Sequence, residues 1–172
     1  SNATANVTLL SGSNVVPVPQ ICAVTVDSIT QRNMIVWNKH GSRSGADFYT
    51  LEKETATNVF TPLAYIPYDS LSLFVDTSGN PQVTSYRYRL LLTDTCGNTS
   101  AAGNAHRTVH LAQNIGIGGE VNLAWNPYEG NTYTQVNVLR NVNGGAWTTL
   151  TTLPGNVASY SDLTPPAGSL NY

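Results

Sequence analysis

Charged residues are scarce in this chain of 172 residues: Asp, Glu, Lys and Arg make up 10% of it, against about 25% in an ordinary globular domain. The formal net charge of -2 argues against a nucleic-acid partner, because phosphate backbones are bound by clustered Lys and Arg. No apolar run approaches the roughly 18 residues of a membrane span. The composition instead favours β-structure with polar, uncharged faces, which is typical of secreted bacterial proteins.

Helical periodicity is almost absent as well. Short runs that alternate apolar and polar residues recur instead, and turns rich in Gly, Asn, Pro and Asp separate them. Seven such runs are predicted to be strands: 21–29, 33–40, 47–54, 58–66, 71–76, 84–94 and 105–114. Seven short strands with regular turns indicate a β-sandwich.

The last part of the chain repeats landmarks of the first. Four pairs of residues recur in the same order. Trp37 and Trp125 are 88 positions apart, Lys53 and Arg140 are 87 apart, Asp76 and Asp162 are 86 apart, and Tyr88 and Tyr172 are 84 apart. Changes in loop length shift the offset between matching residues gradually along an internal repeat, as observed here. The sequence therefore predicts an all-β fold with two sandwiches in tandem, at 17–112 and 113–172.

Residues 109–114 belong to both predicted repeats, so either the second repeat lacks a first strand of its own or one long strand serves both. Both alternatives leave little free linker, and we expect a stiff tandem. The chain opens "SNA", typical of the remnant of a cleaved tag, and residues 1–16 are predicted to be this remnant and a linker.

The second repeat ends at "SLNY", which matches only the start of the sixth strand of the first repeat. We expect it to be incomplete at its C-terminus, with an open edge at residues 134–141 and an uncovered apolar face around Trp125 and Leu139. The natural chain is then expected to continue past Tyr172. If the chain is stable as it stands, the edge is expected to be hidden by a homodimer, by a borrowed strand or by residues 4–16.

Several of these segments carry a resemblance to a known family. "IVWN" and "LAWN", "FYTLEKE" and "VNVLRN", and "FVDT" followed by "SYRYRLLLTD" resemble tandem fibronectin type III repeats, which have an immunoglobulin-like fold. Tyr86 fits the tyrosine-corner position of that fold, where the ring packs in the core and the hydroxyl bonds nearby backbone. His106 and His110 match positions of its seventh strand, where they are structural.

A narrower resemblance concerns "AVTVDS", "YRYRLLLTDTCGNTS", "HRTVHL" and "LAWNPYEG". These segments look like repeats in large exported proteins of Bacteroidetes, which often carry a C-terminal sorting domain for type IX secretion. The resemblance implies a secreted or cell-surface location.

The resemblance also bears on the two cysteines. In that fold Cys22 opens the first strand and Cys96 follows the sixth, and both fall at one pole of the sandwich. It therefore implies a disulfide between them, with two free thiols as the alternative. A zinc site would need four closely spaced ligands, and the sequence implies no metal or cofactor.

Aromatic residues are the remaining candidates for a binding site. Trp37 and Trp125 are expected in the core, and five others lie near predicted loops: Tyr65, Tyr68, Tyr128, Tyr133 and Trp147. Exposed rings of this kind can stack on sugars, although single exposed aromatics are common without a function.

Catalysis has one weak candidate, Glu52 and Glu54, which share a strand face roughly 6.6 Å apart. Carboxylates near that separation can hydrolyse glycosides, but no concave site is indicated and we expect no enzyme. We expect a non-enzymatic spacer, scaffold or adhesion module that joins other domains of a larger chain and contacts a protein or glycan. The alternative is a carbohydrate-binding accessory module of a secreted hydrolase.

Overall fold

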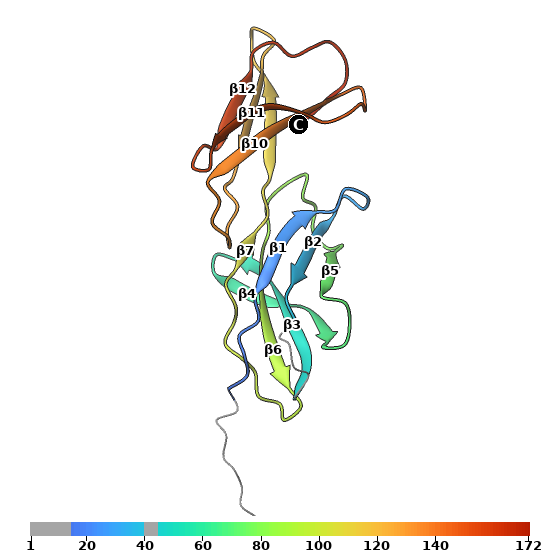
Figure 1. The fold of residues 1–172 in the computed structure, drawn as a ribbon, viewed down its shortest axis with the longest axis vertical. Helices are drawn as coiled ribbons and strands as arrows, with labels where there is room; N and C mark the ends of the chain where they lie inside the picture. The colour runs from blue at the N-terminus through green and yellow to red at the C-terminus, as the bar shows by residue number, and fades with distance from the viewer. Residues whose placement is uncertain (1–14, 40–44) are drawn as a thin grey trace, which may run out of the picture.

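The chain forms two β-sheet units that follow one another along the long axis of the molecule (Figure 1). The computed structural model describes residues 15–39 and 45–172. Within these ranges every regular element is a β-strand and none is a helix, which confirms the all-β prediction. Most of the predicted tag remnant and linker, residues 1–14, lies outside the described residues.

The first unit consists of two antiparallel sheets. One has the order β1-β2-β5, with β1 at Ile21–Val26, β2 at Asn33–Trp37 and β5 at Leu73–Asp76. The other has the order β4-β3-β6-β7, with β4 at Val59–Pro67, β3 at Ala46–Ala56, β6 at Arg87–Asp94 and β7 at His106–Arg107. Each predicted run of the first part coincides with a strand, because its alternating residues divide between a core face and a solvent face.

The second unit repeats this strand order. Its first sheet is β12-β9-β8, with β12 at Ser159–Asp162, β9 at Val121–Trp125 and β8 at Leu111–Ile115. Its second sheet is β11-β10-β13, with β11 at Thr148–Pro154, β10 at Gln135–Val142 and β13 at Leu170–Asn171. The predicted run 105–114 is thus divided: β7 belongs to the first unit, and β8 pairs with β9 of the second.

The first unit has the larger core. Its sheets pack Ile35 and Trp37 against Tyr49, Leu51 and their neighbours, all of which are buried. The rings of Trp37 and Tyr49 meet edge to face with centroids 5.5 Å apart. Complete burial of an aliphatic or aromatic side chain contributes about 1.5–3 kcal/mol, so this cluster is the main source of stability in the unit.

The second unit has a smaller core, in which Val121, Leu123 and Val138 are buried. Trp125 is only partly buried, and Leu139 is 40% exposed. Val138 faces the core and Leu139 does not, because neighbouring residues of a strand point to opposite faces. The expected uncovered face around Trp125 and Leu139 is therefore found only in part, because Val138 is buried, Trp125 is partly buried and Leu139 lies on the other face of β10.

A buried carboxylate occupies the same place in each unit. Asp76 accepts hydrogen bonds from Lys53 (2.8 Å) and from the hydroxyl of Tyr88 (2.6 Å). Burial alone would raise the pKa of Asp76, but the hydrogen bonds from Lys53, Ser78 and Tyr88 lower it.

In the second unit Asp162 accepts from Arg140 (2.6 Å) and from the hydroxyl of Tyr172 (2.8 Å). Three of the four landmark pairs in the sequence thus form matching hydrogen-bond networks. In the network of the second unit, burial and the Asp162 carboxylate raise the pKa of Tyr172 to about 12.

Tyr86 confirms the expected hydrogen bond of a tyrosine corner. Its hydroxyl accepts a hydrogen bond of 2.9 Å from the backbone N–H of Asn80, six residues earlier. The ammonium group of Lys53 lies 4.2 Å from the centre of the Tyr86 ring. The ring packs partly buried against the core of the first unit.

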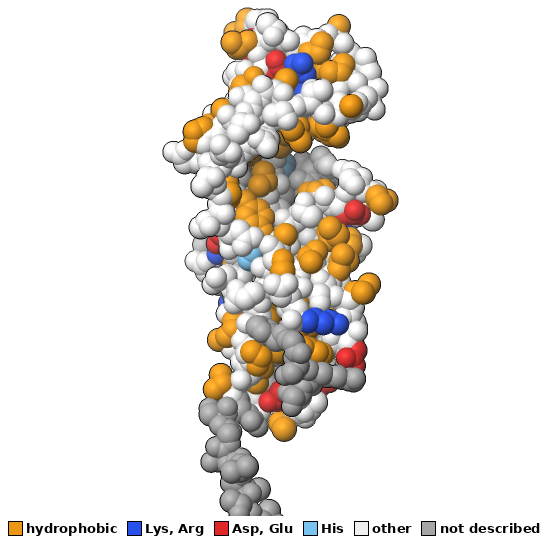
Figure 2. All heavy atoms as spheres, in the orientation of Figure 1, with side chains coloured by type: hydrophobic (Ala, Val, Ile, Leu, Met, Phe, Trp, Pro, Cys, Tyr) orange, Lys and Arg blue, Asp and Glu red, His pale blue; other side chains and the backbone are white. Residues whose placement is uncertain are grey.

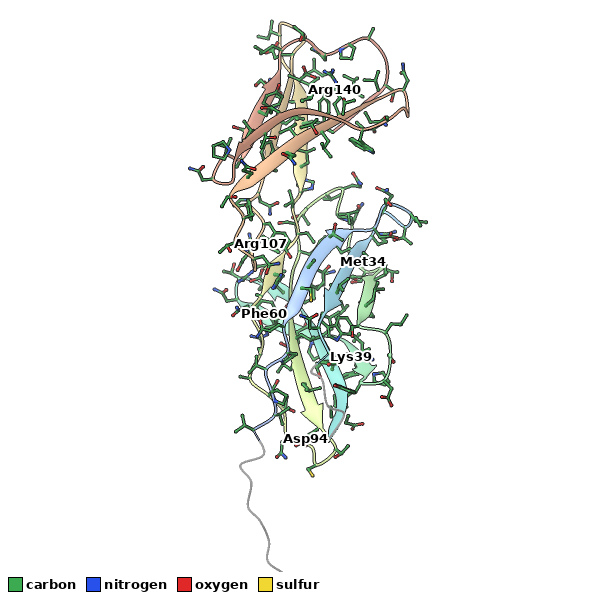
Figure 3. All side chains as sticks on the ribbon, in the orientation of Figure 1. Met34, Lys39, Phe60, Asp94, Arg107 and Arg140 are labelled. Carbon is green, nitrogen blue, oxygen red and sulfur yellow. The ribbon has the colours of Figure 1, made fainter. Side chains whose placement is uncertain are left out.

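The implied disulfide between Cys22 and Cys96 is not formed, and both cysteines are free thiols. The carbonyl of Cys22 accepts a hydrogen bond from Asn131 of the second unit, so Cys22 lies near the junction of the two units. Cys96 lies just after Asp94, at the opposite end of the first unit (Figure 3).

The strand direction explains why this implied pairing is wrong. Cys96 lines a surface hollow together with Val16, which precedes Cys22 by six residues. Six extended residues span about 20 Å, whereas a disulfide requires Cα atoms about 5.5 Å apart. The segment before β1, and not β1 itself, lies beside Cys96.

Candidate functional site

The junction of the two units is the most elaborate polar site in the described part of the chain. We call it the joint, and it consists of the connecting residues 106–110, the loop 126–133 and the first-unit groups that they contact. Figure 2 shows that the face in view carries few charged side chains and that hydrophobic side chains gather where the units meet.

The connecting residues are clamped from both sides. The backbone N–H of Thr108 donates to the carbonyl of Tyr86 (3.0 Å), and the N–H of Tyr86 donates back to the Thr108 hydroxyl (2.9 Å). From the second unit, the side-chain amide of Asn126 donates to the Thr108 carbonyl and accepts from the N–H of His110, both at 2.8 Å. A segment held in this way has little freedom to bend.

Tyr128 of the second unit reaches into the first. Its hydroxyl accepts a 3.0 Å hydrogen bond from the backbone N–H of Val24 in β1. The same oxygen lies 2.9 Å from Nδ1 of His106 in β7, and the two rings meet edge to face. The hydroxyl therefore bonds to both sheets of the first unit at once.

His106 is buried, with 2% of its surface exposed. Burial lowers the pKa of its imidazole, although the Glu129 carboxylate acts in the opposite direction. The ring is therefore neutral near pH 7. Because the Tyr128 oxygen accepts from Val24, its hydrogen is free to donate to Nδ1 of the neutral ring.

Glu129 adds an ionic contact beside this hydrogen bond. Its backbone carbonyl accepts from the N–H of Arg107 at 3.0 Å, and its carboxylate lies 2.6 Å from Arg87 and 3.3 Å from Arg107. Arg87 also pairs with Glu54 at 2.7 Å. Burial lowers the pKa of Arg87, but the two carboxylates outweigh burial and the pKa is raised. Figure 3 shows Arg107 between the two units.

Gly130 allows the loop to approach His106. Its φ angle is +117°, which L-residues with a side chain rarely adopt. A Cβ atom at this position would lie 2.3 Å from the His106 ring. The side-chain amide of the next residue, Asn131, donates a hydrogen bond of 2.8 Å to the carbonyl of Cys22. The tip of the loop therefore contacts the first unit.

The five aromatic residues that the sequence singles out do not come together. Tyr128 lies in the joint, and the hydroxyl of Tyr133 accepts from the N–H of Tyr128 at 3.2 Å. Tyr68 is 7% exposed and stacks on Tyr49 in the core. Tyr65 and Trp147 are exposed, by 66% and 55%, but they belong to different units.

The two glutamates considered for catalysis are engaged in ion pairs. Glu52 lies 2.5 Å from Arg89, and Glu54 lies 2.7 Å from Arg87. The guanidinium of Arg89 also lies 4.4 Å from the centre of the Phe60 ring. These contacts form a ladder on the outer face of β3, β4 and β6.

Metal-ligand groups and membrane-spanning helices are two further kinds of feature that bear on function. Residues 15–39 and 45–172 contain no group of three or more His, Cys, Asp or Glu placed to hold a metal ion. In the same ranges no helix is long and apolar enough to cross a membrane.

Comparison with protein-family models and with curated proteins finds no match to this chain. The assignment of function therefore depends on the geometry of the joint. The sequence singles out Tyr128 as a candidate for a binding site and places it in "LAWNPYEG", a segment with a family resemblance. The sequence does not indicate the joint itself, because Tyr128 and Asn131 have their partners 104 and 109 residues away.

Proposed function

We propose that this chain is a tandem of fibronectin type III-like β-sandwiches that acts as a stiff, non-enzymatic spacer or scaffold in a secreted or surface protein. Its partners are the domains that it separates in a larger chain. The scarcity of charge and the polar, uncharged strand faces suit an extracellular setting, and the repeated strand order suits a tandem.

The observation that carries this proposal is the hydrogen-bonded joint. A spacer sets a distance only if its units cannot swing freely, and free swinging is the default for domains joined by a small polar interface. Here Tyr128 and Asn131 bond to β1, and Glu129 bonds to Arg87 in β6, a strand of the other sheet. Contacts to separate strands oppose both bending and twisting.

The carbohydrate-binding alternative has weaker support. Sugar-binding surfaces of β-sandwiches present several coplanar exposed rings, whereas Tyr65 and Trp147 stand on different units. Tyr65 does meet Phe48 edge to face, with centroids 5.8 Å apart, so one small aromatic patch exists on β3 and β4. Affinity electrophoresis on a panel of polysaccharides, with Tyr65→Ala as the control, tests this patch directly.

The spacer function can be tested by measuring the distance between the units. Cys96 in the first unit is exposed and accepts a spin label, and Thr149→Cys supplies a second site on β11 once Cys22 is replaced by Ser. We expect one narrow distance distribution from double electron–electron resonance. A broad distribution in this otherwise unaltered protein would rule out the spacer function.

A further inference from the structure

Two edge strands of the first unit lie side by side where its two sheets part (Figure 1). Among the strands of the described ranges, β1 pairs only with β2 and ends one sheet, and β7 pairs only with β6 and ends the other. β1 and β7 belong to different sheets and are not paired with each other. We call the line between them the seam, and its backbone groups need partners from elsewhere because an edge strand leaves one side of its backbone unpaired.

Residues 128–131 of the second unit lie across the seam, and we call them the strap. On the side of β1, the N–H of Val24 donates to the Tyr128 hydroxyl at 3.0 Å. The carbonyl of Cys22, two residues earlier, accepts from the side-chain amide of Asn131 at 2.8 Å. The strap thus bonds to two backbone groups of an edge strand.

The strap bonds to β7 as well. The N–H of Arg107 donates to the carbonyl of Glu129 at 3.0 Å, and the two residues form an isolated antiparallel bridge. Nδ1 of His106 lies 2.9 Å from the Tyr128 hydroxyl. The strap therefore joins the last strands of both sheets of the first unit.

The seam is buried only in the presence of the strap's contacts. Val24 and His106, one on each side of it, are 3% and 2% exposed. The N–H of Val24 and Nδ1 of His106 both bond to Tyr128, which belongs to the second unit. Buried backbone N–H groups are nearly always paired, and a buried polar group that loses its partner is destabilising. The first unit thus completes its seam with a side chain that it does not itself contain.

The dependence runs in one direction. The strap is held in shape within its own unit, where the N–H of Tyr128 donates to the Tyr133 hydroxyl at 3.2 Å. The buried core of the second unit consists of Val121, Leu123 and Val138, and the partly buried residues packed against it also belong to the second unit. Loss of the strap's contacts therefore removes partners from buried groups of the first unit and leaves the core of the second intact.

We propose that the strap is a conformational lock, which closes the seam between β1 and β7 and makes the folded state of the first unit depend on that of the second. When the second unit unfolds or the strap lifts, β1 and β7 lose their partners together. This inference goes beyond the spacer function, which concerns the angle between the units and not the stability of either one.

The test uses the full chain and a double variant, Tyr128→Phe with Asn131→Ala, which removes the strap's bonds to Val24, His106 and Cys22. Its matched control is Tyr160→Phe with Asn114→Ala. These are the same chemical changes in the second unit, on β12 and β8 and outside the strap. Native-state amide exchange in increasing urea is followed separately on β2 and β3 for the first unit and on β9 and β10 for the second.

We expect the strap variant to speed exchange in β2 and β3 by about tenfold or more, and exchange in β9 and β10 by less than about twofold. The control should leave β2 and β3 unchanged. Unchanged exchange in β2 and β3 of the strap variant, or equal acceleration in both units, would overturn the proposal.

A second variant tests the lock without altering the strap. Leu123 is 2% exposed in the core of the second unit, and Leu123→Asp unfolds that unit because an unpaired charge is costly to bury. We expect exchange in β2 and β3 to accelerate at least as much as in the strap variant. Wild-type exchange there, with the second unit unfolded, would show that the first unit closes its seam alone. A broad distance distribution in the wild type would remove the spacer function and leave these results standing.

Discussion

The hydroxyl of Tyr128 lies 2.9 Å from Nδ1 of His106 and joins two β-units that Glu129 and Asn131 also link. The same oxygen accepts from the N–H of Val24. A single side chain of the second unit thereby completes the hydrogen bonding of buried groups on β1 and β7. The following predictions begin from this contact.

Replacing Tyr128 with Phe removes the hydroxyl but keeps the ring. The N–H of Val24 and Nδ1 of His106 then lose their partner, and an unsatisfied buried polar group costs about 1–3 kcal/mol. We expect the midpoint of urea denaturation to fall and the distance distribution between the units to broaden. Tyr65→Phe makes the same chemical change on an exposed side chain, and it should leave both measurements unchanged.

Gly130→Ala introduces a Cβ atom that would lie 2.3 Å from the ring of His106. We expect the loop to lift from the first unit, so that limited proteolysis cleaves faster between residues 108 and 133. Gly119→Ala is the matched control, because Gly119 also has a positive φ of +87° but has no atom within 4 Å of the added Cβ. Equal protease sensitivity of the two variants would contradict the tight contact at Gly130.

Acid should loosen the joint through His106. The pKa of the buried imidazole is lowered from its ordinary value of 6.5, so the unfolded chain takes up this proton first as the pH falls. The stability that depends on neutral His106 is therefore complete above about pH 6.5 and is lost as the pH falls through the lower folded pKa.

NMR titration of the His106 ring, with inter-unit distances measured over the same pH range, checks this prediction. Glu129 faces the same ring and favours its charged form, so Glu129→Gln should lower the pKa of His106 further. His110→Gln serves as the control, and in this variant the distance between the units should change with pH as it does in the wild type. A pH-independent distance distribution down to pH 4 would contradict the prediction.

Asp76→Asn should destabilise the first unit strongly. The carboxylate is 1% exposed and pairs with Lys53 at 2.8 Å, and breaking one side of a buried ion pair costs about 3–5 kcal/mol. Asp162→Asn makes the same change in the second unit, where Tyr172 is less buried than Tyr88. We therefore expect a smaller loss of stability in the second unit. Calorimetry checks this prediction through the separate unfolding transitions of the two units.

The lowered pKa of Asp76 gives the same network a pH dependence. Its stabilising effect is present above the ordinary value of 3.8 and is lost as the pH falls through the lower folded pKa. The wild type should therefore lose stability in strong acid, whereas Asp76→Asn should lose less over the same range. Urea midpoints measured from pH 5 to pH 2 provide the comparison.

Both cysteines should react as free thiols. Cys96 is exposed and Cys22 is half-buried, so we expect Cys96 to be alkylated first and Cys22 more slowly in protein that has not been reduced. Intact-mass analysis measures the two steps, and reductant should not change the melting temperature. A mass lower by two hydrogens, reversed by reductant, would show the pairing that this structure lacks.

The sequence by itself determined the strands, their order and the repeated landmarks of this protein. Alternation of apolar and polar residues is a local property, so β3, β6 and β10 could be placed from a few neighbouring residues. The recurrence of Lys53 and Asp76 as Arg140 and Asp162 at nearly constant offsets likewise indicated the repeat, but only the structure shows that these side chains pair.

Only the tertiary structure decided which distant groups meet. The bonds of Tyr128 to Val24 and of Asn131 to Cys22 join residues more than one hundred positions apart, and no local pattern encodes them. Likewise, Cys22 and Cys96 lie at opposite ends of one unit because the chain before β1, rather than β1, runs beside Cys96. The joint arises from how finished strands pack, since side-chain alternation specifies a strand's faces but not its neighbours.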